Sequence, residues 1–271
     1  MELCLITDKT EFAAEAEKVG IERIMLDLER TGKRKRQMGR DLFISDHIIA
    51  SVPRMRAVLG KARLVVRVNP LSHKSCEEID AVIEAGADFM MLPYFHSVDE
   101  VRGFRSLVAA RAKTILLVET KSAVEILPTL VKERLGDEVH IGLNDLRISL
   151  GNRTIFDPLC NGMIERLSAL LRGEKIPFGV GGIARLSHDR LPINPEHVLA
   201  EQVRLEAGIG WLGRSFREDM ENRRRPGELA CEVELIRKAI NKWESAPEEA
   251  LAANRKILRE EVAGWEAAIS A

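Results

Sequence analysis

The sequence predicts an α/β protein, a closed (β/α)8 TIM barrel with a C-terminal helical extension. Its 271 residues are enough for one large α/β domain or two small ones. Short runs rich in Val, Ile and Leu, as strands buried on both faces require, alternate with longer amphipathic stretches. This alternation repeats eight times, which favours a closed parallel barrel over an open sheet.

The predicted strands follow one another along the chain with helices between them. The strands lie at 3–7, 23–28, 64–68, 89–93, 114–118, 140–143, 178–180 and 209–212. The helices lie at 11–19, 45–59, 77–85, 98–111, 123–135, 158–171 and 195–207, and Pro195 suits a first helical turn behind Asn194 as cap. The alternative, a doubly wound sheet, would usually carry a glycine-rich turn after its first strand, but residues 7–10 contain no glycine.

The chain from about Arg223 onward has a different pattern, so we divide the protein into a catalytic barrel at 1–222 and C-terminal helices at 223–271. Ser245 and Glu248 form a capping-box pattern for the second of these helices. The apolar stripes of the two helices can pack on their own barrel or on a neighbouring subunit, and the pattern leaves both alternatives open. The stripes are Leu229, Val233, Ile236, Ile240 and Trp243, then Leu251, Leu258, Val262, Trp265 and Ile269.

Bulk composition disfavours several classes of function. The formal net charge is -1, with 41 Lys and Arg against 42 Asp and Glu, so no overall basic field attracts nucleic acid. Aromatic residues make up only 4%, which disfavours stacking platforms for single strands. The chain contains no run of about 18 apolar residues, and it opens without a signal-peptide pattern. We therefore expect a soluble cytoplasmic protein without a membrane partner.

The four cysteines, Cys4, Cys76, Cys160 and Cys231, are widely spaced and include no CxxC pair. We therefore predict free thiols in a reducing cytosol. Cys160 as a nucleophile would need a histidine partner, which the spacing does not nominate.

Polar residues at the ends of predicted strands are the candidates for chemistry, because the active site of such barrels lies at the C-terminal ends of the strands. Arg67 lies in an otherwise apolar strand, and a buried guanidinium needs an anionic partner. It is either half of a structural ion pair or a fixed cation aimed at a substrate oxyanion. Glu119 is the first charge after the fifth apolar run, although a contact with a helix N-terminus would explain it equally well.

Two further pairs of carboxylates complete this set. Asp145 follows the sixth strand, which we expect to be adjacent to the strand of Glu119 and at the same level, so the two can share one hard cation such as Mg²⁺. Asp27 and Glu29 end the second strand, and alternation places both on one side. They can orient Arg67, bind metal-bound water, or act as acid or base, and a purely structural pairing with Arg67 is an equal alternative.

Three other features have weaker signals. The basic run at 30–36 is typical of a solvated loop, with a clamp for phosphate or coenzyme A as the second interpretation. The glycines at 179–182 can offer backbone N–H groups to an anion or can relieve crowding at the barrel rim. No two histidines have metal-ligand spacing; we predict that His140 is a core residue and that His47 lies on a surface helix.

These groups, in this order, resemble the HpcH/HpaI aldolase and citrate lyase β-subunit-like family of the phosphoenolpyruvate/pyruvate superfamily. The resemblance covers roughly 1–217, and the ordered set is more specific than any one motif. The matching pieces are Asp27-Leu28-Glu29, Arg67-Val68-Asn69, Gly86-Ala87-Asp88, Leu92-Pro93, Glu119-Thr120, and Gly142-Leu143-Asn144-Asp145-Leu146 followed by Leu150-Gly151.

The resemblance implies a role for each matched residue. Glu119 and Asp145 match the two metal-ligating carboxylates, and the metal would be Mg²⁺ or Mn²⁺. Arg67 matches the arginine that contacts the enolate oxygen, and the backbone N–H groups of Asn144 and Asp145 match the donors that hold the substrate's carboxylate. The implied reaction is carbon–carbon bond cleavage or formation through an enolate of a 2-keto acid or an acyl-CoA. The implied assembly is a homo-oligomer, often a trimer or hexamer.

The chain also departs from the family pattern. Arg30 stands where the aldolase branch continues toward a proton-transferring histidine and where the citrate-lyase-like branch usually has a further acid. Tyr94 stands where a lysine commonly follows Leu-Pro. Glu29 and Asp27 are therefore the candidates for the general base. Two alternatives stay open: another enolate reaction of the superfamily, such as acyl-CoA thioester hydrolysis, and a non-catalytic barrel that binds a small acid.

Overall fold

A computed structural model describes residues 1–30, 48–187, 191–222 and 225–270. Its eight strands form a closed parallel barrel in chain order, which confirms the predicted (β/α)8 fold. The strands are β1 (Glu2–Ile6), β2 (Arg23–Asp27), β3 (Arg63–Arg67), β4 (Phe89–Leu92), β5 (Lys113–Val118), β6 (Glu138–Ile141), β7 (Phe178–Ile183) and β8 (Ile209–Leu212). Every residue of β2, β4, β6 and β8 is buried, as parallel strands covered on both faces require.

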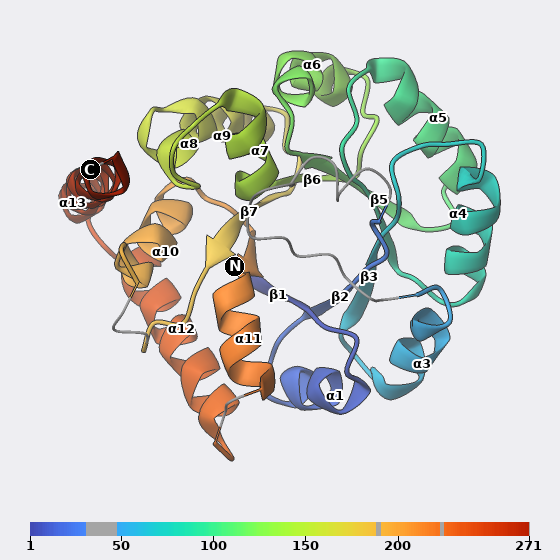
Figure 1. Cartoon of the computed structure of the whole chain (residues 1–271), viewed down its shortest axis with the longest axis horizontal. Coiled ribbons are helices and arrows are strands. Elements are labelled where there is room, and N and C mark those ends of the chain that lie inside the picture. The colour runs from blue at the N-terminus through green and yellow to red at the C-terminus, as the bar shows by residue number, and fades with distance from the viewer. Residues whose placement is uncertain (31–47, 188–190, 223–224, 271) are drawn as a thin grey trace. The chain divides into compact units, whose positions relative to one another are not determined.

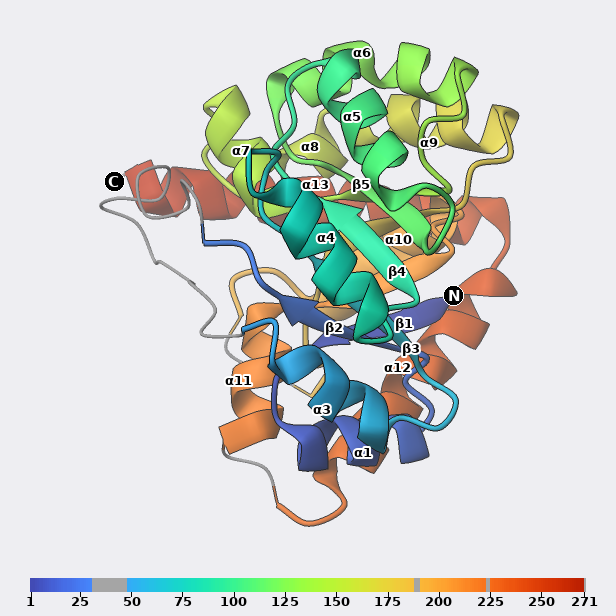
Figure 2. The ribbon, with the colours of Figure 1, turned by 90° about the vertical axis from the view of Figure 1, so that its right-hand side faces the viewer.

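Contacts divide the chain into two compact units, an N-terminal unit, Cys4–His140, and a C-terminal unit, Met1–Leu3 with Ile141–Ala271. The N-terminal unit holds α1 (Thr10–Lys18), α3 (Ser51–Val58), α4 (Ser75–Glu84), α5 (Val98–Val108) and α6 (Lys121–Lys132). In Figures 1 and 2, α3, α4 and α5 follow one another along the outer side of this unit's strands. Their apolar faces cover the strands and leave the strand ends for polar side chains.

The C-terminal unit contains more helices than the sequence predicts. They are α7 (Leu143–Leu150), α8 (Asp157–Cys160), α9 (Met163–Gly173), α10 (Pro195–Arg204), α11 (Arg214–Asn222), α12 (Glu228–Glu244) and α13 (Glu248–Ser270). The sequence analysis missed α7 and α11. The prediction of one continuous helix at 158–171 is wrong: the segment forms two helices, because Gly162, with φ of 83°, separates α8 from α9.

The two C-terminal helices both pack on α10 of their own chain, as Figure 1 shows. Leu229, Val233, Ile236 and Ile240 of α12 are buried, as are Leu258 and Val262 of α13. The predicted capping box is wrong, since Ser245 is the C-cap of α12 and α13 begins after Pro247. Ile257 and Ile269, on the other hand, are 43% and 54% exposed. The division at residue 222 and the assembly state stay predictions.

Other predicted elements differ at their ends. Of the predicted helix at 45–59, α3 covers Ser51–Val58, and 45–47 lie outside the described residues. Among the described residues no helix is long and apolar enough to cross a membrane.

Candidate active site

Arg67 ends β3 and is held by a carboxylate of the neighbouring strand. The register of β2 and β3 places Asp27 opposite Arg67. Arg67 Nε donates to Asp27 Oδ1 at 2.8 Å, and its Nη2 donates to Asp27 Oδ2 at 2.6 Å. Arg67 is 7% exposed and Asp27 is 0% exposed. Two parallel hydrogen bonds fix the plane of the guanidinium, so the C-terminal end of β3 presents a rigid cation.

Two more buried carboxylates act on Arg67. Glu29 Oε2 lies 3.6 Å from Arg67 Nη1, and Glu119 adds its charge from the end of β5. Burial acts to lower the pKa of Arg67, but the charges of Asp27, Glu29 and Glu119 outweigh it and raise that pKa. With its three carboxylates ionised, this group of four residues, which we call the Arg67 cluster, carries a formal charge of -2.

Glu119 is fixed by the segment that follows β4. Its Oε1 accepts a hydrogen bond from the Tyr94 N–H at 3.1 Å, and Tyr94 has the left-handed φ of 49°. A residue other than glycine in this conformation is strained and marks a segment held by its surroundings. Glu119 does not cap the next helix: Thr120 is the N-cap of α6 and accepts from the Ala123 N–H at 3.0 Å. The helix-contact explanation for Glu119 is therefore wrong.

Asn69 links the ends of β2 and β3, and the sequence analysis assigned it no role. Its side-chain carbonyl accepts from the Arg30 N–H at 2.9 Å, while its amide donates to Glu78 of α4 at 2.7 Å. Burial raises the pKa of Glu78, and the hydrogen bonds from Asn69 oppose that rise. Asn69 thereby fixes the backbone at the point where the basic run begins; residues 31–36 of that run lie outside the described residues.

Asp145 and Asn144 lie in the first turn of α7, a helix that starts where a strand was expected to continue. β6 ends at Ile141, and Gly142 is the N-cap of α7. Asp145 therefore follows the sixth strand, as predicted, but lies in a helix that was not predicted. The N–H groups of the first turn have no partner within a helix and point toward its N-terminal end, where they and the helix dipole favour an anion. Asp145 is 8% exposed and Asn144 is exposed.

Three features that the sequence singled out have structural roles. The glycines at 179–182 lie within β7 rather than after it, and a Cβ on Gly182 would come within 3.3 Å of Leu143 and Phe156. Burial raises the pKa of Cys160 to about 12, which disfavours a nucleophilic thiolate. Burial, with the charges of Arg23 and Arg67, lowers the pKa of His140 to about 3, so this core histidine is neutral.

A second buried ion pair lies at the N-terminal ends of the strands. Arg23 of β2 donates to both carboxylate oxygens of Glu138 in β6, at 2.5 and 3.0 Å. The guanidinium also lies 4.7 Å from the centroid of the Phe89 ring. This pair was not predicted, because both residues lie at the edges of apolar runs, where a charged residue is ordinary.

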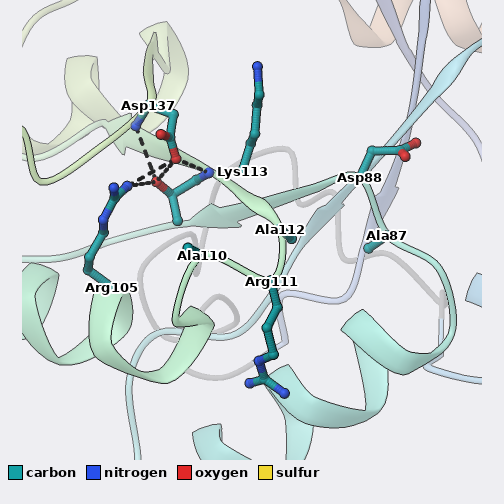
Figure 3. A pocket seen from close by; sticks show the side chains of 9 residues that line it. Ala87, Asp88, Arg105, Ala110, Arg111, Ala112, Lys113 and Asp137 are labelled. Carbon is teal, nitrogen blue, oxygen red and sulfur yellow. Dashed lines mark hydrogen bonds and ion pairs between the residues drawn. The ribbon is translucent and has the colours of Figure 1, made fainter.

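A pocket of about 380 Å³ also lies at the N-terminal ends of the strands in the N-terminal unit (Figure 3). Asp137 Oδ2 accepts from the Thr114 hydroxyl at 2.6 Å and from Arg105 at 3.0 Å. Arg111 is bound to Asp80 at 2.6 Å, and Figure 3 shows it pointing away from Asp137. These polar groups bond to one another at the N-terminal ends of the strands: Thr114 is the second residue of β5, and Asp137 directly precedes β6. The pocket therefore belongs to the end of the barrel that serves stability, opposite the end where barrel active sites lie.

The chain offers buried carboxylates of the kind that a hard divalent cation prefers. Glu119 supplies a buried carboxylate, Asp145 supplies another within its own unit, and carboxylate oxygen is the preferred ligand of Mg²⁺. The described residues contain no group of three or more His, Cys, Asp or Glu side chains that could hold a metal ion. A Mg²⁺ site needs fewer, since waters and substrate usually complete the octahedron.

Comparison with known proteins assigns the family. The family model described as HpcH/HpaI aldolase/citrate lyase matches residues 3–155. The chain belongs to the HpcH/HpaI aldolase/citrate lyase family. Membership supports a lyase-type function and confirms the resemblance drawn from the ordered motifs.

Solved structures with related folds agree with the barrel. An HpcH/HpaI aldolase from Desulfitobacterium hafniense DCB-2 has 12% identity, a TM-score of 0.59, and coverage of 91% of this chain and 94% of that one. RipC from Yersinia pestis has 15% identity, a TM-score of 0.55, and coverage of 93% and 98%. An HpcH/HpaI aldolase/citrate lyase family protein from Burkholderia cenocepacia J2315 has 15% identity, a TM-score of 0.59, and coverage of 90% and 95%. At such identities the likeness shows the fold alone.

A curated relative matches a shorter part of the chain. A pyruvate kinase of Agrobacterium vitis is 30% identical over 86 residues, which make up 32% of this chain. The match spans only 17% of the length of that relative.

Proposed function

We propose that this protein is a divalent-metal-dependent carbon–carbon lyase that works through an enolate of a 2-keto acid or an acyl-CoA. The observation that carries the proposal is the rigid, buried guanidinium of Arg67, fixed by Asp27 at the strand end where barrel chemistry takes place. A fixed cation of this kind stabilises negative charge that develops on a substrate oxygen, and it needs no reorganisation to do so.

The metal ligands we propose are Glu119 and Asp145, and the ion is Mg²⁺ or Mn²⁺. When bound, such an ion acts as a Lewis acid that polarises a carbonyl oxygen. The Arg67 cluster supports this assignment, because it gathers three carboxylates around one guanidinium, and carboxylate oxygen is the ligand that a hard divalent cation prefers. Glu119 is held in place by the Tyr94 N–H, so it needs little reordering to bind the ion.

The substrate carboxylate, in this proposal, binds at the N-terminus of α7 through the backbone N–H groups of Asn144 and Asp145. Arg67 contacts the oxygen on which enolate charge develops. The name of the pyruvate kinase relative supports pyruvate, a small 2-keto acid, as the product or nucleophile. We further propose a homo-oligomer, for which the exposed apolar residues of α13, Ile257 and Ile269, offer surface.

The test measures pyruvate release from a panel of 4-hydroxy-2-keto acids, and acid release from a parallel panel of CoA thioesters. Each panel is run with Mn²⁺ and after chelation. We expect turnover that depends on the metal and is lost in Asp145→Asn, while Asp137→Asn, at the opposite ends of the strands, keeps it. Turnover that survives chelation and Asp145→Asn would overturn the metal assignment. Calorimetric binding of Mn²⁺ and oxalate without turnover of any substrate would instead favour the non-catalytic barrel.

A further inference from the structure

The proposed reaction needs a group that moves a proton, and the carboxylates near Arg67 are poorly suited to it. Both oxygens of Asp27 accept hydrogen bonds from Arg67, and its side chain is 0% exposed. Glu29 is equally buried beside the same guanidinium. Proton transfer by either would weaken the contacts that hold Arg67. We therefore assign Asp27 and Glu29 to positioning, and the proton-transfer group lies elsewhere on the strand ends of the N-terminal unit.

Three consecutive residues after β4 are each bound to the segment that follows β5. The Tyr94 N–H donates to Glu119 at 3.1 Å. The Thr120 hydroxyl donates to the Phe95 carbonyl at 3.0 Å. His96 Nδ1 lies 2.8 Å from Ser122 Oγ. These bonds run in register, so His96 is held at a fixed position relative to Glu119 and to the first turn of α6.

The His96 ring is oriented from several sides. Its partner ring, Tyr94, meets it edge-to-face, with centroids 4.7 Å apart and planes at 89°. The backbone N–H of His96, which fixes the main chain beneath the ring, donates to Glu100 of α5 at 2.6 Å. With Nδ1 occupied by the Ser122 hydroxyl, Nε2 is the nitrogen left for substrate. His96 is exposed, so it can exchange protons with water.

We propose that His96 is the general acid–base of the lyase reaction, with Ser122 and Tyr94 as its positioning residues. This inference rests on the proposed lyase function. Imidazole is the side chain whose ordinary pKa lies nearest neutrality, so it can both accept and return a proton during one turnover.

The proton balance of the cleavage is complete with one imidazole. His96 Nε2 takes the proton of the hydroxyl on C4 of a 4-hydroxy-2-keto acid. The C3–C4 bond breaks, its electron pair forms the enolate, and C4 becomes the carbonyl carbon of the released aldehyde. The imidazolium then returns the same proton to C3, which yields the 2-keto acid. No oxidant or reductant takes part.

The other described histidines of the N-terminal unit, His73 and His140, are less suited to this role. His140 is buried and its pKa is lowered to about 3. His73 is exposed in the loop between β3 and α4, but no hydrogen bond or ion pair with a described residue orients its ring. The segments bound to residues 94–96 carry three charged groups: Glu100 of α5, which accepts from the His96 backbone N–H, Glu119, which accepts from the Tyr94 N–H, and Lys121 at the start of α6. Because His73 is exposed at the same strand ends and no described residue orients its ring, it offers a matched control for His96.

The experiment compares His96→Gln with His73→Gln in the Mn²⁺-loaded protein, over pH 5 to 9. For His96→Gln we expect kcat to fall by about 10²–10⁴-fold, with KM and the Mn²⁺ affinity measured by electron paramagnetic resonance unchanged. The acid limb of the pH profile should disappear. Added imidazole should restore part of the rate in His96→Ala, and Ser122→Ala should lower kcat while keeping the acid limb. His73→Gln should resemble the unmodified protein.

The outcomes separate the two proposals. If the unmodified protein turns over neither panel, the proposed function fails and the assignment of His96 fails with it. If the unmodified protein is active and His96→Gln keeps its rate and its acid limb, the assignment of His96 alone is overturned. A lower kcat with an intact acid limb and no imidazole rescue would also overturn it, because that result is a structural effect.

Discussion

Two buried arginines lie at opposite ends of the strands in the N-terminal unit, and their charge balance differs. Arg23, at the N-terminal ends, is bound to the carboxylate of Glu138 and lies against the Phe89 ring. Arg67, at the C-terminal ends, is surrounded by Asp27, Glu29 and Glu119. The first group is neutral in formal charge and the second carries -2.

We interpret the first group as a structural ion pair and the second as part of the proposed metal site. A neutral pair with two good hydrogen bonds offsets part of its own desolvation. In a carboxylate-rich group, the proposed metal ion would add a further favourable charge. Buried arginine–carboxylate contacts can therefore have different roles. The balance of charge around each arginine distinguishes these roles, whereas the presence of a salt bridge alone does not.

The largest expected effect comes from Glu119→Gln at the unbalanced end. The amide is nearly isosteric and can still accept from Tyr94, but it removes one of the proposed metal ligands. We expect kcat to fall by about 10²–10³-fold or more, with a free energy of unfolding that is unchanged or higher, because one excess charge is gone. Steady-state kinetics and urea unfolding measure the two quantities. A clear loss of stability would contradict the view that this end is over-supplied with carboxylate.

The matched change at the balanced end, Glu138→Gln, should have the opposite profile. It leaves Arg23 buried without its counter-charge, so the free energy of unfolding should fall by about 3–5 kcal/mol, while kcat of the folded fraction stays unchanged. The double variant Arg23→Met/Glu138→Met should recover most of that loss, since an apolar pair of similar volume replaces an ion pair well. If the double variant does not regain the lost stability, the pair has a role beyond balancing its own two charges.

Added metal should stabilise the unbalanced end only. At a Mn²⁺ concentration of 100 times Kd, binding to the folded state adds about 2.7 kcal/mol to the free energy of unfolding. We expect this increment in Glu138→Gln and its absence in Glu119→Gln, as measured by thermal unfolding with and without the ion. Equal increments in both variants would place the metal elsewhere.

Sequence reasoning found the unbalanced end and missed the balanced one for a physical reason. Arg67 interrupts a run of apolar residues, so its burial and its need for a partner can be predicted from the strand alone. Arg23 and Glu138 lie at strand edges, where a charge is ordinary. Their pairing depends on which strand ends face each other, and local sequence does not contain that information.

The fold followed the same rule. Strand–helix alternation was enough to predict the closed barrel, because period and burial are local properties. The start of α7 at Leu143 was not predicted, since Gly142 was assigned to a strand and its role as N-cap depends on where the chain turns after β6. His96 was overlooked because its significance comes from Ser122 and Tyr94, which are fixed only once β4 and β5 lie side by side.

The two arginines also act together on His140, which predicts a pH effect of intermediate size. Its pKa is lowered by burial, then by Arg23 and Arg67, to about 3, below the ordinary 6.5. The folded state therefore binds fewer protons than the unfolded state between those values, and stability from this group is complete above pH 6.5 and falls as pH drops toward 3. Between pH 6.5 and 5 the loss is about 2 kcal/mol. For His140→Gln, the free energy of unfolding, measured by urea unfolding at each pH, should change less steeply with pH over that range.

The smallest effect should come from Asp137→Asn in the pocket beside the balanced end. Asp137 Oδ2 accepts from the Thr114 N–H at 2.7 Å, from the Thr114 hydroxyl at 2.6 Å, and from Arg105 at 3.0 Å. The amide keeps a carbonyl acceptor and loses the charge, and the site is partly exposed, so the free energy of unfolding should fall by only about 1 kcal/mol. No kinetic constant should change, because the group lies at the N-terminal ends of β5 and β6. A changed kcat would show that the N-terminal ends of the strands also take part in function.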